Sequence, residues 1–405
     1  MGLQIGIGSG KGQSPFNIGR QAAREAISAM RRPLPHQGIA FTFASSRYAP
    51  EDLLRGIKTV LGAVPVIGAT TAGELSPKGV DSDTCIVMCL FSDNLNISIG
   101  LGEECGRNSR AAGHHCAHAA NKALLEQIKK YSVSGRERLC FIALFDGLRG
   151  NGSNIIRGIQ EALGTSFPIV GGAAADDFYF NETKQFYDSA VYTDSVAGVL
   201  FGGELSIGIG ARHGWRPLGK TMTVSQSMDN IVMEIDGRPA AKIYEHYFEN
   251  EVRLIGKEPL TKLAILYPVG MSIPGEEEFL IRHPMNIKQN GAMVFAGEVP
   301  EGSAVRLMMG SRESALESAK LAALEAKNNL AGAEPRFLIV FDSASRRRLL
   351  GREAPKEIEA IRSVFNDIPF VGFCTYGEFA PLKSELHAGT SYFHNESIVI
   401  LAVGS

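Results

Sequence analysis

Apolar and polar residues follow one another along the chain in a pattern that occurs three times. Each copy has an apolar stretch typical of a buried strand, a polar turn, a segment with apolar residues three and four apart, and a second short apolar stretch. The first strands and helices predicted in this way cover 38–43 and 50–61, 139–145 and 153–163, and 336–341 and 356–365. A strand-helix-strand unit of this length favours parallel strands joined by a right-handed crossover.

The second strand of each copy begins with the same motif of proline, two apolar residues and glycine, at Pro65–Gly68, Pro168–Gly171 and Pro369–Gly372. Six residues after each glycine the chain carries an acid, and these acids are Glu74, Asp177 and Glu378. A repeat at such wide spacing predicts duplicated folding units whose loops gather at one place and frame a ligand crevice.

Beyond each repeated glycine the pattern changes to short strands separated by turn residues, which predicts antiparallel hairpins. We therefore expect a mixed α/β fold, in which repeated strand-helix-strand units carry antiparallel hairpin extensions and form two closely packed halves. The predicted division is an N-terminal strand and helix (1–34), a first domain (35–235) and a second domain (236–405).

Composition narrows the classes of function. The net charge of −2 provides no broad basic field, so we expect no nucleic-acid or acidic-membrane partner. The longest apolar runs are shorter than the ~20 residues that a membrane-spanning helix requires. The six cysteines form no Cys-x-x-Cys pair and no signal peptide precedes them, which indicates a reduced, cytoplasmic setting.

Two motifs suggest a binding site but lack the residue spacing that such a site requires. The glycine-rich stretch 6–12 lacks the spacing of a phosphate-binding loop, and a glycine turn between a strand and a helix is the expected structure. His114 and His118 would share one face of a helix and could bind zinc. No second ligand pair follows them at a typical spacing, so an amphipathic helix over 107–130 is the favoured interpretation.

Acids in the loops are candidate ligand-binding residues. The three repeated acids could accept hydrogen bonds from a ligand amine, or could cap backbone N–H groups of their own turns. Asp146 and Asp342 follow the first strands of their units, at positions that look equivalent, and leave the same two alternatives open. Arg346 begins the basic run Arg346–Arg348, and its guanidinium group would suit a carboxylate or phosphate.

Three further residues have chemistry of their own. Cys374 begins a loop after a strand, but packing is favoured over a nucleophilic role because its counterparts in the other copies are Thr70 and Ala173. His213 and His283 are the candidate axial ligands if a haem b is bound, although neither spacing is diagnostic.

Taken together, these residues resemble the FIST family of sensory proteins (F-box and intracellular signal transduction), with its FIST N and FIST C domains. The similarity runs from about residue 35 to the C-terminus and is carried by 67–74, 170–178, 214–219, 235–240, 279–282 and 372–378. The sequence departs from the family pattern at 343–346, where a cysteine is often found and this chain has Ser343.

The resemblance implies a bacterial cytoplasmic input domain that binds a small molecule such as an amino acid. It also implies a partner, such as a histidine kinase or a cyclic-dinucleotide enzyme, and with no kinase or cyclase in the sequence we expect the signal to pass to a separate protein. Our first hypothesis is a sensor without enzymatic activity or a committed cofactor, whose ligand is bound by Thr70, Thr71, Glu74, Asp146, Asp177, Asp342, Arg346, Thr375 and Glu378. The alternatives are a haem-based nitric-oxide sensor that regulates a partner kinase, an enzyme that uses Cys374 or a carboxylate pair, and a scaffold.

Overall fold

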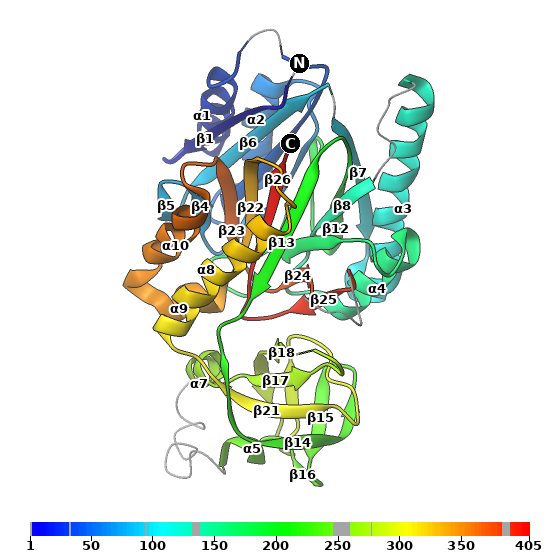
Figure 1. Cartoon of the computed structure of the whole chain (residues 1–405), viewed down its shortest axis with the longest axis vertical. Helices are drawn as coiled ribbons and strands as arrows, with labels where there is room; N and C mark the ends of the chain where they lie inside the picture. The colour runs from blue at the N-terminus through cyan, green and yellow to red at the C-terminus, as the bar shows by residue number, and fades with distance from the viewer. Residues whose placement is uncertain are drawn as a thin grey trace.

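A computed structural model describes the chain except residues 1, 32–33, 94, 132–137, 246–259, 277 and 383–388. Three units of the same design form a large body, and a smaller β domain is inserted into the third unit (Figure 1). Units one and two run strand, helix, strand, helix and then four strands, and unit three follows the same order with an extra helix and a short 3₁₀ helix after its second strand. The predicted mixed α/β class, with repeated strand-helix-strand units and antiparallel hairpins, is confirmed.

The first two units are continuous in sequence. Unit one comprises β1 (Gln4–Gly10), α1 (Pro15–Ser28), β2 (Gln37–Ser45), α2 (Pro50–Leu61), β3 (Val66–Thr71), β4 (Glu74–Ser76), β5 (Gly79–Asp81) and β6 (Cys85–Ser92). Unit two comprises β7 (Leu95–Glu103), α3 (Cys105–Tyr131), β8 (Arg138–Phe145), α4 (Gly152–Leu163), β9 (Ile169–Ala173), β10 (Gln185–Tyr187), β11 (Ala190–Tyr192) and β12 (Ser195–Gly203).

The third unit is interrupted after its first strand. It comprises β13 (Ser206–Arg212), α8 (Arg312–Asn328), β22 (Pro335–Ser343), α9 (Ala344–Leu350), the short 3₁₀ helix Gly351–Glu353, α10 (Pro355–Phe365), β23 (Phe370–Thr375), β24 (Glu378–Pro381), β25 (Ser391–His394) and β26 (Ile398–Gly404). The inserted domain contains β14 (Arg216–Met228), β15 (Ile231–Ile235), β16 (Arg238–Pro239), α5 (Lys242–Glu245), α7 (Leu260–Leu266), β17 (Val269–Ser272), β18 (Phe279–Arg282), β19 (Pro284–Ile287), β20 (Met293–Phe295) and β21 (Ala304–Met309). The predicted boundary at residue 235 coincides with the end of β15, inside this insertion, and the predicted domain division stays a prediction.

Each unit completes the sheet of another unit. The three sheets of the body have the orders β1-β6-β2-β3-β10-β11, β7-β12-β8-β9-β24-β25 and β13-β26-β22-β23-β4-β5. In each sheet the last two strands are a hairpin from a different unit, so the exchange is cyclic. Among the described strands, the parallel pairs are β2–β3, β8–β9 and β22–β23, as the crossover pattern predicts.

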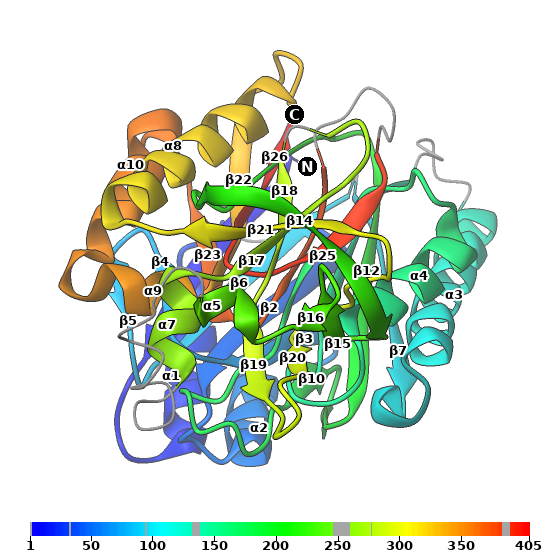
Figure 2. The same cartoon turned by 90° about the horizontal axis from the view of Figure 1, so that it is seen from below.

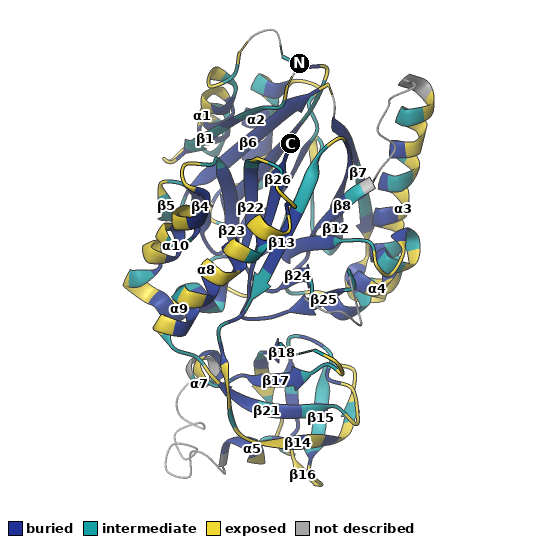
Figure 3. Cartoon of the chain, viewed as in Figure 1, coloured by how far each residue is buried: buried dark blue, intermediate teal, exposed yellow. Residues whose placement is uncertain are grey.

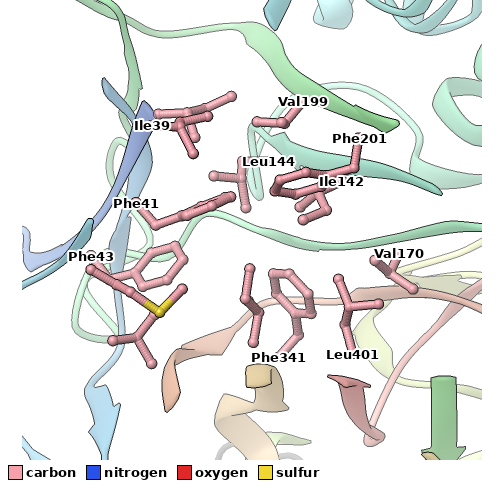
Figure 4. Packing of buried hydrophobic residues seen from close by; sticks show 14 of the residues in the cluster. Ile39, Phe41, Phe43, Ile142, Leu144, Val170, Val199, Phe201, Phe341 and Leu401 are labelled. Atoms are coloured by element: carbon pink, nitrogen blue, oxygen red, sulfur yellow. The ribbon is translucent and has the colours of Figure 1, made fainter. Parts of the chain in front are cut away.

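The inner faces of the three sheets enclose one apolar core. Phe43 of unit one stacks on Phe373 of unit three with ring centroids 4.6 Å apart, and Phe41 stacks on Phe201 of unit two. Figure 4 shows the rings of Phe41, Phe43, Phe201 and Phe341 with aliphatic side chains from all three units. The helices lie outside, in pairs at three corners (Figure 2), and their outward faces are exposed whereas the strands are largely buried (Figure 3). The core therefore fills the centre of the body, so that a ligand pocket must lie toward its surface.

Residues 6–10 of the glycine-rich stretch belong to strand β1, and residues 11–12 lie in the short bend between this strand and α1. In the strand, Gly6 and Gly8 face the backbone of α1, where an added Cβ would lie 1.9 and 2.1 Å from the carbonyl oxygens of Ala26 and Ala22. The same close approach recurs where β7 meets α3 and where β13 meets α8, through Gly100, Gly102, Gly208 and Gly210. Glycine is thus required at these strands because a helix packs directly against the backbone.

We expect Gly102→Ala to lower the free energy of unfolding by about 1–3 kcal/mol, the usual cost of overpacking. The added Cβ would lie 1.9 Å from the carbonyl oxygen of Ala112, so α3 would have to move away from β7. Urea denaturation measures the loss. Gly2→Ala is the control, because its Cβ meets nothing within 4 Å, and an equal effect of the two substitutions would contradict the packing argument.

Candidate functional site

The three repeated loops meet, as the sequence pattern predicts, and backbone hydrogen bonds join them. Ala72 N–H donates to Cys374 O at 3.0 Å, connecting unit one with unit three. Ala173 N–H donates to Gly377 O at 2.7 Å, connecting unit two with unit three, and Ala175 N–H donates to Thr70 O at 2.9 Å, connecting unit two with unit one. The three loops thus form a closed ring, called the ring below.

Glu74 and Glu378 stabilise this ring from inside. The Thr71 hydroxyl donates to one oxygen of Glu74, and the amide and hydroxyl of Thr84 donate to the other. Glu378 is bound in the same way by the Thr375 hydroxyl and a backbone amide. Both carboxyl groups are fully buried. Burial raises the pKa of Glu74 to about 7, and burial raises the pKa of Glu378 well above its usual range.

Asp177 is not the structural counterpart of these two glutamates, although it has the same spacing in sequence. In strand β10, Gln185 lies opposite Ala69, the residue after the repeated glycine of unit one. In strand β24, Glu378 lies opposite Gly172, the residue after the repeated glycine of unit two. Gln185 is therefore the residue that corresponds to Glu378. Gln185 accepts a hydrogen bond from the Ser195 hydroxyl at 2.8 Å. The loop after β9 is longer than its equivalents, so the hairpin begins later and Asp177 remains in the loop.

The predicted equivalence of Asp146 and Asp342 is wrong by one residue. Asp342 pairs with Cys374 across the parallel strands, whereas Phe145 occupies the corresponding position of unit two and Asp146 lies one residue beyond it. Asp146 caps its turn, because its two oxygens accept hydrogen bonds from the amides of Leu148, Arg149 and Asp194 at 2.8–3.0 Å. Its role as a cap explains the carboxylate without a ligand.

Arg346 is a fully buried arginine whose guanidinium group is bound by several groups of the protein. Its guanidinium donates to the carboxylates of Asp342 and Glu357 and to the carbonyl oxygens of His213 and Ala315. Burial and the Glu357 carboxylate raise the pKa of Asp342 well above its usual range, against the effect of Arg346.

Of the predicted ligand-binding residues, all but Asp177 are buried and form hydrogen bonds within the fold. Thr70 belongs to the same set, since its hydroxyl accepts a hydrogen bond from the Lys184 amide at 3.0 Å. Direct contact of these residues with a ligand stays a prediction, and the described geometry assigns them to the walls and turns of the ring.

A pocket of about 320 Å³ lies at the surface beside the ring. All three units line it, through Ala72 and Ser82, through Asp177 and Phe178, and through Arg347, Arg348 and Gly351. Arg347 donates hydrogen bonds to the carbonyl oxygen of Ala72 and to the Ser82 hydroxyl. The guanidinium of Arg348 lies over the Phe178 ring, 4.0 Å from its centroid, in a cation–π contact.

The charges of this pocket are only partly satisfied. Within the described part of the chain, Arg347 and Arg348 form no ion pair with a carboxylate. One oxygen of Asp177 accepts hydrogen bonds from the Ser45 hydroxyl and from the amide and hydroxyl of Ser46 at 2.8–2.9 Å. Its other oxygen accepts none from the residues that the structure describes. The N–H groups of Arg348, those of Arg347 that are not bonded to Ala72 and Ser82, and one carboxylate oxygen of Asp177 therefore remain available to a ligand.

A strained loop forms one wall of the pocket. Asp177, Phe178 and Phe180 have positive φ angles of 53°, 67° and 53°, which non-glycine residues rarely adopt. Asp176 holds this backbone by accepting hydrogen bonds from three amides of the loop, and the Tyr376 hydroxyl donates to Asp176 at 2.7 Å. Strain of this kind is found at sites where a precise geometry is needed.

The structure divides the arginine run that the sequence singled out. Arg346 points into the fold, whereas Arg347 and Arg348 line the pocket. No sequence pattern pointed to Ser82, and Phe178 entered only as part of the resemblance at 170–178, although the length of the loop after β9 relative to its two counterparts also marks Phe178.

The histidines proposed for a haem are engaged with carboxylates. His213 accepts a hydrogen bond from Trp215 N–H at its Nδ1, and its Nε2 lies 3.1 Å from the Glu278 carboxylate. Burial acts against ionisation of Glu278, but His213 and Arg212 outweigh it and lower the pKa. His283 Nδ1 lies 2.6 Å from Glu396. His213 is thus bound at Nδ1, whereas its buried Nε2 faces the Glu278 carboxylate without a hydrogen-bond partner among the described residues. In His283 the nitrogen that does not face Glu396 is Nε2. An axial-ligand role stays a prediction for both histidines.

The remaining candidate groups are the Cys374 thiol and the histidine pair of α3. The Cys374 thiol is fully buried and burial raises its pKa well above the usual range, which opposes formation of a nucleophilic thiolate. His114 and His118 stack on one face of α3, and no group of three metal-binding side chains occurs among the described residues. No helix in the described part of the chain has the length and apolar character needed to cross a membrane.

Comparison with known proteins identifies relatives of undefined function. A protein of Mycobacterium tuberculosis is 26% identical over 241 residues, which are 57% of this chain and 62% of that protein. A protein of Methanocaldococcus jannaschii is 24% identical over 290 residues, 69% of this chain and 55% of that protein. Both are described as uncharacterised, and the chain matches between 55 and 62% of the length of these relatives.

Among solved structures, the chain is similar over its whole length to cyanuric acid hydrolase from A. caulinodans, with a TM-score of 0.39 and 9% identity. A likeness at this level carries no functional argument. Family models are decisive, since the FIST N domain matches residues 38–238 and the FIST C domain matches residues 240–381. The chain therefore belongs to the FIST family.

Proposed function

We propose that the protein is a non-enzymatic sensor that binds a small zwitterion, of the amino-acid class, in the pocket between its three units. FIST domains are sensory domains that bind small ligands in signalling proteins. The observation that carries the proposal is the pair Arg347 and Arg348, which face Asp177 in one pocket without a carboxylate partner among the described residues. The arginines would bind the carboxylate of the ligand and the free oxygen of Asp177 its ammonium group.

The size of the pocket supports this ligand class. At about 320 Å³ it is at the small end of the range for ligand pockets, roughly 300–1,000 Å³. Because each unit contributes residues, a bound ligand would bridge all three units and favour one arrangement of them. We infer that this arrangement is read by a separate cytoplasmic partner, such as a histidine kinase or a cyclic-dinucleotide enzyme.

We expect a thermal-shift panel of amino acids, small carboxylates and small amines to find a compound that raises the melting temperature. A compound that lacks the ammonium or the carboxylate group should bind more weakly than the zwitterion. Arg348→Ala should weaken binding of the best compound by roughly tenfold, because a hydrogen bond between charged groups is lost.

Arg352→Ala is the matched control. Arg352 is exposed, follows α9 directly, is not among the residues that line the pocket, and forms no ion pair within the described residues. If no compound in the panel stabilises the protein, or if both arginine variants weaken binding equally, the pocket is not the site.

A further inference from the structure

We propose that helix α9 couples the pocket to the inserted β domain, so that the insertion changes its docking on the body when the pocket is occupied. This inference rests on the proposed function for the origin of the signal. It makes the insertion, residues 216–309, the output module of the sensor.

The three arginines of α9 point to three different parts of the molecule. Arg348 lies over Phe178 of unit two, and Arg347 binds Ala72 and Ser82 of unit one. Arg346 donates to the carbonyl oxygen of His213 at 2.7 Å, at the point where the chain leaves β13 for the insertion. A force on the pocket arginines therefore acts on the same rigid helix that binds the entry to the insertion.

The return crossing is bound to α9 as well. Arg312 begins α8 just after the chain leaves the insertion, and its Nε donates to the carbonyl oxygen of Leu349 at 3.0 Å. Leu349 and Leu350 pack in one apolar cluster with Trp215, Ile265 and Met308 of the entry segment and the insertion. Figure 1 shows α9 at the edge of the body next to α7 of the insertion. Both covalent connections of the insertion are thus held by α9.

Elsewhere the insertion contacts the body through Leu382 and Tyr392, which pack against its apolar core, and through polar contacts, which can rearrange. Its Glu298 pairs with Arg157 of α4, its Glu278 lies 3.3 Å from Arg212, and its His283 pairs with Glu396. Packed interfaces of this kind switch between discrete arrangements, and a ligand shifts the balance by its differential affinity for them.

The chain provides its own reporter of this docking. Trp215 is the only tryptophan, is 3% exposed, and donates its indole N–H to the carbonyl oxygen of Ile265 in the insertion at 2.9 Å. Its fluorescence, its quenching by acrylamide and hydrogen exchange of the insertion can be measured on the full chain without knowing the ligand.

We expect Arg347→Ala, which removes the hydrogen bonds from α9 to Ala72 and Ser82 of unit one, to increase acrylamide quenching of Trp215 by roughly twofold or more. Hydrogen exchange should accelerate in β17, β18 and β21 and stay unchanged in the strands of units one and two. Ser82→Ala removes one partner of Arg347 without altering α9, and should produce a smaller change of the same kind. Arg352→Ala should behave like the wild type.

Unchanged quenching and exchange in both Arg347→Ala and Ser82→Ala would overturn the coupling, as would an acceleration spread evenly over the body, which marks global destabilisation. These outcomes are separate from failure of the proposed function. If no compound in the panel binds, the proposed ligand is wrong, but the coupling can still be measured. If a compound stabilises the protein and Trp215 does not respond to it, the proposed ligand stands and the coupling is wrong.

Discussion

Replacing Arg346 by methionine is expected to lower the free energy of unfolding by about 3–5 kcal/mol, the cost of breaking a buried ion pair from one side. The substitution removes the cation that lies between Asp342 and Glu357, and all three side chains are buried. Two neighbouring carboxyl groups would then be buried without a counter-charge. The carbonyl oxygens of His213 and Ala315 would also lose their donor.

Urea denaturation at neutral pH, read as the midpoint at constant slope, measures this loss. Arg348→Met is the matched control on the same helix, and as a surface substitution it should change stability by no more than about 0.5 kcal/mol. Adding Asp342→Asn and Glu357→Gln to Arg346→Met should recover part of the loss, because the uncompensated charges are removed as well. A loss in Arg346→Met as small as that in Arg348→Met would show that the cluster contributes little.

The position of Arg346 also shows which property of the candidate site cannot be predicted from the sequence. The run of three arginines predicts a cationic site, but which member faces solvent depends on the phase of a helix as short as Ala344–Leu350. The spacing of four residues between Asp342 and Arg346 is compatible with an internal ion pair, and the structure has that pair with 2.9 Å between Nε and Oδ1. A functional assignment to Arg347 and Arg348 needs the fold, because Phe178 and Ser82 come from other units.

The units themselves were predictable, whereas their exchange of hairpins was not. Hydrophobic periodicity located β2, β8 and β22, with the helices and parallel strands that follow them, because burial sets the pattern of each segment. Which sheet a hairpin joins depends on the length and direction of the loop before it. Because the loop before β10 is longer than its counterparts, the residue six positions after the repeated glycine is Asp177, which lies in the loop. The residue that occupies the strand position of Glu378 is Gln185.

The first unit has a glutamate where the second has this glutamine, and the difference predicts a pH effect. Folded-state burial raises the pKa of Glu74 to about 7, from an ordinary value of 4.5. Between these two values the folded chain holds a proton at Glu74 that the unfolded chain has released. The contribution of Glu74 to the free energy of unfolding is therefore fully present below about pH 4.5, falls as the pH rises, and is lost above about pH 7. The total loss over this range is about 3 kcal/mol.

We expect Glu74→Gln to remove this dependence and to stabilise the protein at pH 8 by an amount approaching that loss, while leaving it nearly unchanged at pH 5. An amide imitates the protonated carboxyl group, since its oxygen can accept from the amide and hydroxyl of Thr84 and its NH₂ group can donate to the Thr71 hydroxyl. Gln185 already occupies the equivalent place in unit two, beside Ser195, so the fold accepts glutamine in this environment.

Urea denaturation at several pH values between 5 and 8 separates this effect from a general change in stability. Glu359→Gln is the control, because Glu359 is exposed on α10 and its loss should leave the pH dependence as it is in the wild type. Glu378→Gln should reproduce the stabilisation, since burial raises the pKa of Glu378 in a site of the same design. If Glu74→Gln instead destabilises the protein equally at pH 5 and pH 8, the carboxylate is bound in its charged form, and the ring of loops depends on that charge rather than on a retained proton.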